Sequence, residues 1–185
     1  MKKFVVGLIV GIFLVPLAAL LYFLSGSAPV ATSDPMMPFE KVIAGAALHA
    51  RVDKEMPKEV PVKADEATYS AGAMVYLHQC AVCHGVLNQP ESAIAKGMFP
   101  HPPQLLPPGH GVTDDPPGES FWKVKNGIRL TGMPGFHASL SDEDMWQVSV
   151  MLANADKLPD SVKKDLMSEP VPGAQSAAPS APEKK

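Results

Sequence analysis

The chain contains only two cysteines, and they lie three residues apart in the run Cys80-Ala-Val-Cys83-His84. Two cysteines cannot form the disulfide framework on which many small secreted folds depend. Residues three apart on a helix share one face. Thiols at that spacing can add to both vinyl groups of a haem, and the histidine that follows then projects toward the iron. The motif therefore predicts one covalently attached haem c, held by Cys80, Cys83 and His84.

Three different interpretations of the cysteine pair are weaker. A structural zinc site needs four ligands, and the sequence has neither a second CxxC nor an HxxxH pattern. A thioredoxin-like redox pair starts a helix in a βαβ unit, but strand-forming runs are scarce here. A disulfide between residues so close in sequence would be strained. Haem attachment is the interpretation that uses all five residues.

A haem iron held by His84 needs a ligand on its other face, and the loop Gly132-Met133-Pro134-Gly135 supplies a thioether. Met133 stands between glycine and proline rather than on an apolar helix stripe, so core packing does not explain it. We expect Met133 to be the ligand, with Met98 as its nearest rival. The sequence is also compatible with an iron that has no ligand on this second face. A further histidine could also ligate it, and the candidates are His78, His101, His110 and His137.

An uncharged run from Phe4 to Leu24 follows Lys2 and Lys3. At ~1.5 Å per residue such a helix is long enough to cross the ~30 Å hydrocarbon core of a bilayer. A cleaved signal peptide usually has a shorter apolar stretch, although the small residues 25–28 offer a cleavage site. Flanking lysines favour the cytoplasmic side. We therefore expect residues 1–24 to be an uncleaved single-pass anchor in the cell inner membrane, with the haem domain on the periplasmic side.

Proline and glycine divide the rest of the chain. Residues 25–64 are expected to form a proline-rich stalk, and residues 159–185 a disordered tail rich in Pro, Ala and Ser. Within the stalk, residues 39–55 have helical periodicity. The apolar face expected for that helix consists of Phe39, Val42, Ile43, Ala46 and Ala47.

The haem domain itself is assigned to residues 65–158. Three helices are expected there: one over residues 65–80, a short one around residues 120–127, and one that starts at Ser141. Asp144 completes an approximate capping box with Ser141. The proline-rich segment between the first two helices is expected to be loop. The sequence therefore predicts an all-α domain.

Taken together, these motifs resemble a class I c-type cytochrome. The matching residues, in chain order, are Gly72, Tyr76, Cys80-Ala-Val-Cys83-His84-Gly85, Pro103-Gln-Leu105, Thr131-Gly-Met133-Pro134 and Trp146. The resemblance implies the class I cytochrome c fold, a few helices around one haem, with Gly72 and Tyr76 packed against the last helix. It also implies that the carbonyl of Pro103 accepts a hydrogen bond from His84.

A haem with His and Met ligands passes single electrons. We therefore expect a membrane-anchored mono-haem electron carrier, not an enzyme, that works between respiratory or dehydrogenase partners in or at the membrane. A single CxxCH excludes a di-haem peroxidase, and a net charge of -3 offers no basic footprint for nucleic acid. Two further hypotheses stay open: a subunit with a mainly structural or assembly role, and a haem-based sensor, which would require a labile Met133.

The charges of residues 65–158 suggest a docking hypothesis. Lys123, Lys125 and Arg129 precede the Met133 loop, which in the resembled family borders the exposed haem edge. A basic patch there would steer a redox partner. A solvated face with no steering role explains these charges equally well.

Overall fold

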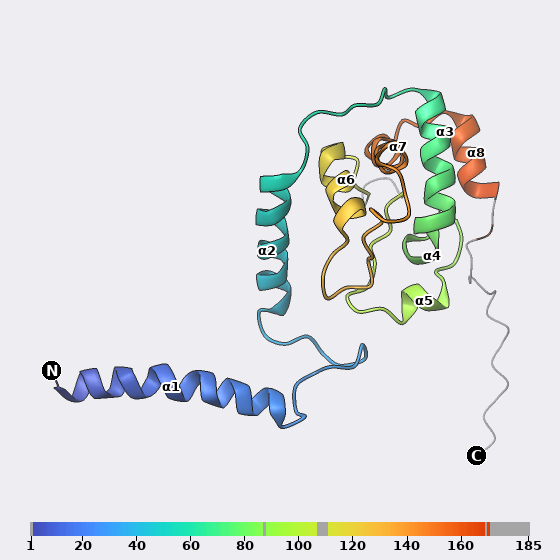
Figure 1. The fold of residues 1–185 in the computed structure, drawn as a ribbon. Coiled ribbons are helices and arrows are strands. Elements are labelled where there is room, and N and C mark those ends of the chain that lie inside the picture. The colour runs from blue at the N-terminus through green and yellow to red at the C-terminus, as the bar shows by residue number, and fades with distance from the viewer. Residues whose placement is uncertain (1, 87, 107–110, 169, 171–185) are drawn as a thin grey trace, which may run out of the picture. The chain divides into compact units, whose positions relative to one another are not determined.

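The computed structural model describes residues 2–86, 88–106, 111–168 and 170. Within these residues all regular secondary structure is helical and no strand occurs, which confirms the all-α prediction. The chain divides into two compact units, residues 1–41 and residues 42–185 (Figure 1).

Helix α1 (Lys2–Leu24) makes up most of the first unit. It has a mean hydropathy of 2.9, and among the described helices it alone is long and apolar enough to cross a membrane. Its apolar side chains are exposed rather than buried against protein, as lipid contact requires. The helix indicates a single-pass membrane anchor.

Helix α2 (Glu40–Glu55) lies where a helix was expected, but the expected apolar face is wrong. Val42 and Ile43 are 68% and 66% exposed, whereas Val52 is 1% exposed. Leu48, one turn before Val52, is partly buried. Helical periodicity permits either stripe to be the inner one, and only the elements packed against α2 select the stripe that contains Leu48 and Val52.

The helix expected over residues 65–80 is α-helical only at first. Asp65 caps α3 (Glu66–Val75) by accepting the backbone N–H of Thr68. A single π-helical turn, η1 (Tyr76–Cys80), follows and leads into α4 (Ala81–His84). π-Turns within α-helices often occur at functional sites, and this one ends at the first cysteine.

Helix α3 crosses α7 (Asp142–Ala153) at Gly72. A Cβ on Gly72 would overlap the backbone carbonyl of Gln147 and lie 2.9 Å from the Cβ of Met151. Tyr76 is fully buried beside this crossing, and its hydroxyl donates to the carbonyl of Gly85 at 2.7 Å. The predicted packing of Gly72 and Tyr76 against the last helix of the domain is confirmed.

The expected capping box is also present, because Ser141 and Asp144 each accept the other's backbone N–H at the start of α7. Helix α6 (Pro117–Asn126) packs on α7, and the rings of Phe121 and Trp146 stack with centroids 4.1 Å apart. A short helix, α5 (Ala93–Lys96), follows α4 and was not predicted.

The tail assigned to residues 159–185 is in part wrong. Residues 160–168 form helix α8 (Asp160–Ser168), which packs on α3 (Figure 1). Val162 and Leu166, one turn apart, are 0% and 1% exposed, so they give this short helix an apolar face that α3 covers. Residues 171–185, where the disordered tail was also placed, lie outside the described residues.

Candidate functional site

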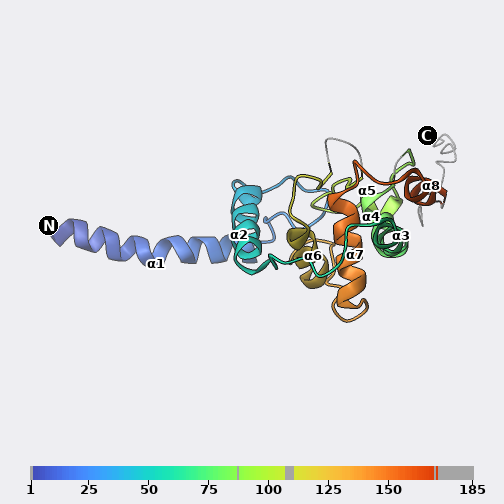
Figure 2. The ribbon, with the colours of Figure 1, turned by 90° about the horizontal axis from the view of Figure 1, so that it is seen from above.

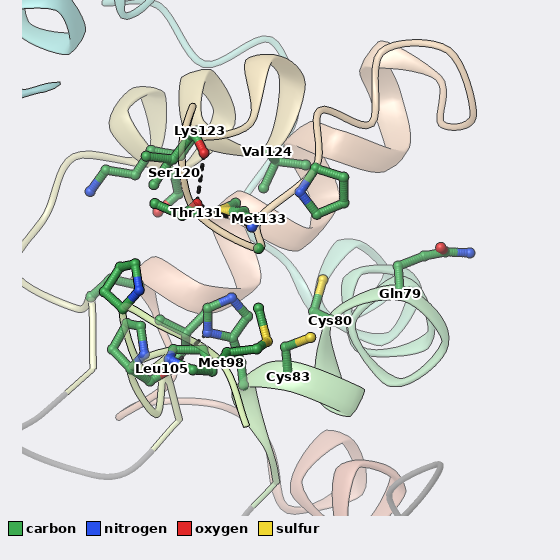
Figure 3. Close-up of a pocket in the computed structure, with 18 of the residues that line it drawn as sticks. Gln79, Cys80, Cys83, Met98, Leu105, Ser120, Lys123, Val124, Thr131 and Met133 are labelled. Carbon is green, nitrogen blue, oxygen red and sulfur yellow. Dashed lines mark hydrogen bonds between the residues drawn. The ribbon is translucent and has the colours of Figure 1, made fainter. Parts of the chain in front are cut away.

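An apolar pocket in the second unit brings together all five residues singled out by the sequence. Its walls come from η1 and α4, residues 98–105 and Val112, α6, the loop 128–136, and single residues of α2 and α7. Figure 3 shows Cys80 and Cys83 on the side of η1 and α4, and Met133 below α6. The five site residues in the lining are Cys80, Cys83, His84, Pro103 and Met133.

Both cysteines are free thiols at the pocket wall. Burial, with a smaller contribution from Cys83, raises the pKa of Cys80 to about 12, and burial also raises the pKa of Cys83. Such thiols are protonated at neutral pH, unlike the reactive thiolates of redox pairs. Among the described residues no three His, Cys, Asp or Glu side chains converge on one point. The local chemistry therefore favours attachment over metal binding by thiolate.

His84 ends α4 with its ring directed by a backbone acceptor. Its Nδ1 lies 2.7 Å from the carbonyl oxygen of Pro103. A carbonyl can only accept, so Nδ1 carries the hydrogen and the lone pair of Nε2 is left for a ligand. Burial lowers the pKa of His84, and the hydrogen bond to Pro103 opposes that shift. The neutral imidazole that an iron ligand requires is thus favoured.

The loop that carries Met133 is tied to the end of α6 by backbone hydrogen bonds. Ile128 donates to the carbonyl of Met133 at 3.1 Å, and Phe136 donates to the carbonyl of Val124 at 2.9 Å. Thr131 adds two bonds: its hydroxyl donates to Ile128 at 2.7 Å and accepts the N–H of Met133 at 3.1 Å (Figure 3). These hydrogen bonds hold the thioether at the pocket.

The other candidate iron ligands differ in whether they line the pocket. Met98 also lines the pocket, and a Cβ on Gly132 would overlap its methyl group. His101 lines the pocket as well, 3.4 Å from Glu91. His78 and His137 are exposed and absent from the lining, while His110 lies outside the described residues. The choice of Met133 over Met98 stays a prediction.

Two of the three cations assigned to a docking patch are engaged within the protein. Lys123 is partly buried in the pocket wall, and its ammonium lies 2.6 Å from Glu119. Lys125 lies 2.8 Å from Asp142 and 5.3 Å from the centroid of the Phe121 ring. The Lys123–Lys125–Arg129 patch is therefore not a set of free surface charges.

These residues fit a haem of the c type. Two unpaired thiols and a neutral imidazole come from one helical turn, a thioether comes from a separate loop, and the remaining lining is largely apolar. Lys123 is the cation in the lining, and its ammonium is paired with Glu119. Sequence reasoning missed Leu48, which contributes to the lining from α2. Its spacing of four residues from Val52 was the only signal available.

A comparison with protein families agrees with this site. Residues 67–150, somewhat less than half of the chain, match the family described as cytochrome C oxidase, cbb3-type, subunit III. The match indicates a c-type cytochrome domain and confirms the resemblance noted from the motifs. Neither the curated proteins nor the solved structures gave a match.

Proposed function

We propose that the c-type cytochrome domain that residues 67–150 form carries single electrons through one haem c, attached to Cys80 and Cys83 and ligated by His84 and Met133. A c-type cytochrome domain binds haem and transfers electrons. The assignment of these residues rests on one observation. A single apolar pocket gathers both thiols, the imidazole and the thioether from segments far apart in the sequence.

The surroundings of the proposed ligands support electron transfer rather than catalysis. When bound, a haem supplies reversible one-electron chemistry, and methionine ligation raises its potential. Pro103 fixes the ring of His84, and the hydrogen-bonded loop fixes Met133, so neither ligand has to move when the charge changes. The apolar walls exclude water from the site. A haem iron held by both His84 and Met133 would have no position left for a substrate.

The apolar helix α1 supports a carrier tethered to the membrane. We propose that the anchor is not cleaved and that it holds the haem domain on the periplasmic side of the inner membrane. The matched family is described as an oxidase subunit, which supports redox partner proteins of a respiratory or dehydrogenase complex.

Covalent attachment is tested with a double variant, Cys80→Ala with Cys83→Ala. We expect the haem-dependent peroxidase stain to survive denaturing electrophoresis in the parent protein and to be lost in the double variant. Met98→Ala, which changes another sulfur of the pocket lining, is the matched control and should keep the stain. A stained band in the double variant would refute attachment.

Ligation is tested by comparing Met133→Ala with Met98→Ala. Loss of the thioether at Met133 should abolish the weak red sulfur-to-iron charge-transfer band and lower the reduction potential, with the haem still attached. Met98→Ala should retain the band. The opposite pattern would assign the ligand to Met98.

The membrane anchor is tested on the holoprotein from its natural host. It should partition with membranes and resist extraction by salt, because a long apolar helix rather than charge holds it. A mature N-terminus near Ala28 in mass spectrometry would instead show that the segment is removed.

A further inference from the structure

Helix α2 precedes the residues that match the cytochrome family, yet it contributes to the pocket. Leu48 lines the pocket together with Ser120 and Lys123 of α6. Figures 1 and 2 both show α2 beside α6, on the side of the domain away from α3 and α4. The segment expected to be a proline-rich stalk, residues 25–64, therefore contributes a residue to the pocket lining and does not serve only as a spacer.

The end of α2 is tied to α6 by one side-chain hydrogen bond and, just beyond the helix, by a close backbone approach. Val52 is 1% exposed. The indole N–H of Trp122 donates to the Glu55 carboxylate at 3.2 Å, and the same carboxylate lies 2.7 Å from Arg51. Just beyond the helix, the carbonyl of Pro57 lies so close to Gly118 that any Cβ there would overlap it. These contacts hold Leu48 against the pocket.

The position of α2 relates to the two edges of a haem. The vinyl-derived edge of a haem c is the one bound by the cysteines, and the two propionates lie on the opposite edge. Because η1 and α4 carry the cysteines on one side and α2 lies on the other, α2 faces the propionate edge. Lys123, the lysine in the lining, is on that side as well.

We propose that α2 is a wall of the haem pocket, with Leu48 covering the propionate edge of the haem and excluding water from it. The inference rests on the proposed haem attachment at Cys80 and Cys83. It makes the folding unit of the site longer than the cytochrome domain expected over residues 65–158.

The test is Leu48→Ala in the full-length holoprotein, with Ile43→Ala as the matched control. Both substitutions shorten an aliphatic side chain of α2, but Ile43 is 66% exposed and is absent from the lining. Burial is one of the levers on haem potential, because water stabilises the more highly charged ferric state. We expect Leu48→Ala to lower the midpoint potential and, because the opened edge admits the reductant, to speed reduction by ascorbate several-fold in spite of the smaller driving force. Ile43→Ala should change neither.

A second pair of variants tests the hydrogen bond between α2 and α6 without changing a residue that lines the pocket. Glu55→Ala removes the acceptor of Trp122, while Arg51→Ala removes the ion pair and leaves that acceptor in place. We expect Glu55→Ala to shift the potential in the same direction as Leu48→Ala, and Arg51→Ala to leave it unchanged. An unchanged potential and reduction rate in both Leu48→Ala and Glu55→Ala would overturn the proposal. The peroxidase stain on the same samples reports separately whether haem is attached.

Discussion

The two sides of the haem pocket are built in different ways. On the cysteine side, one uninterrupted helical run from α3 through η1 to α4 supplies Cys80, Cys83 and His84, and α7 crosses it at Gly72. On the methionine side, a loop without regular structure supplies Met133 and is held by hydrogen bonds to the end of α6. The difference predicts that damage to the first side unfolds the domain, whereas damage to the second releases one ligand.

The largest effect is expected at the helix crossing. In Gly72→Ala the new methyl group would overlap the backbone of α7, which cannot turn away as a side chain can. We expect a loss of about 3 kcal/mol in the free energy of unfolding, the upper end of the range for overpacking. Chemical denaturation of the holoprotein measures it. Gly97→Ala is the control, because a Cβ there would meet its nearest neighbour at an ordinary 3.5 Å. Equal free energies of unfolding for the two variants would contradict the proposed difference between the two sides of the pocket.

On the methionine side, Gly127→Ala should have a smaller and more local effect. Gly127 has a φ of +67°, and a Cβ there would lie 2.5 Å from the backbone nitrogen of Gly135. With a ψ of −177° the backbone lies in a region open essentially to glycine, and that conformation alone costs another residue roughly 1–3 kcal/mol. Because the loop can shift, we expect loss of the sulfur-to-iron charge-transfer band with the haem still attached. Cooperative unfolding of the whole domain would show that the loop is as rigid as the helix crossing.

A single hydroxyl sharpens the same distinction. Thr131→Val keeps the shape of the side chain but removes the bonds to Ile128 and to the N–H of Met133. We expect a loss of about 1 kcal/mol, the ordinary net contribution of a hydrogen bond, together with a weaker charge-transfer band. Thr131→Ser, which retains the hydroxyl, should restore the band. A full-strength band in Thr131→Val would show that the hydroxyl does not hold the methionine.

The smallest effect is expected at Asp115, two residues before α6 begins. Burial, followed by repulsion from Glu119, raises the pKa of Asp115 above its ordinary value. The folded protein therefore binds this proton more readily than the unfolded chain, and the charged carboxylate lowers stability as the pH rises through the ordinary pKa of aspartate and beyond. Asp115→Asn should raise the melting temperature slightly at neutral pH. The gain should vanish below the ordinary pKa of aspartate; a gain that does not depend on pH would exclude this origin.

Much of the cysteine side could be predicted because its determinants are local. The motif at residues 80–84 places two thiols and an imidazole on consecutive turns, and Gly72 and Tyr76 lie on the helix that leads into it. The π-turn was missed, because the residues before Cys80 suit an α-helix equally well. The capping box at Ser141 was predicted because three residues suffice to form it.

The remaining predictions were less accurate because they depend on contacts between residues far apart in the sequence. Helix α8 was assigned to the tail because only Val162 and Leu166 mark its apolar face. That face is buried only because α3 packs against it. The charges near Met133 were interpreted as a surface patch, but Lys123 and Lys125 each have an acidic partner. The partner of Lys125 lies far along the sequence, on another helix.

The sequence by itself determined the CxxCH motif at residues 80–84, the apolar segment that is long enough to cross a membrane, and the helical class of the domain. Each depends on residues within a few turns of one another, where spacing and composition control geometry directly. Only the tertiary structure decided which face of α2 is buried and that Leu48 borders the pocket. Those outcomes depend on side chains that meet across long stretches of chain, because burial is a property of the packed elements and not of either element alone.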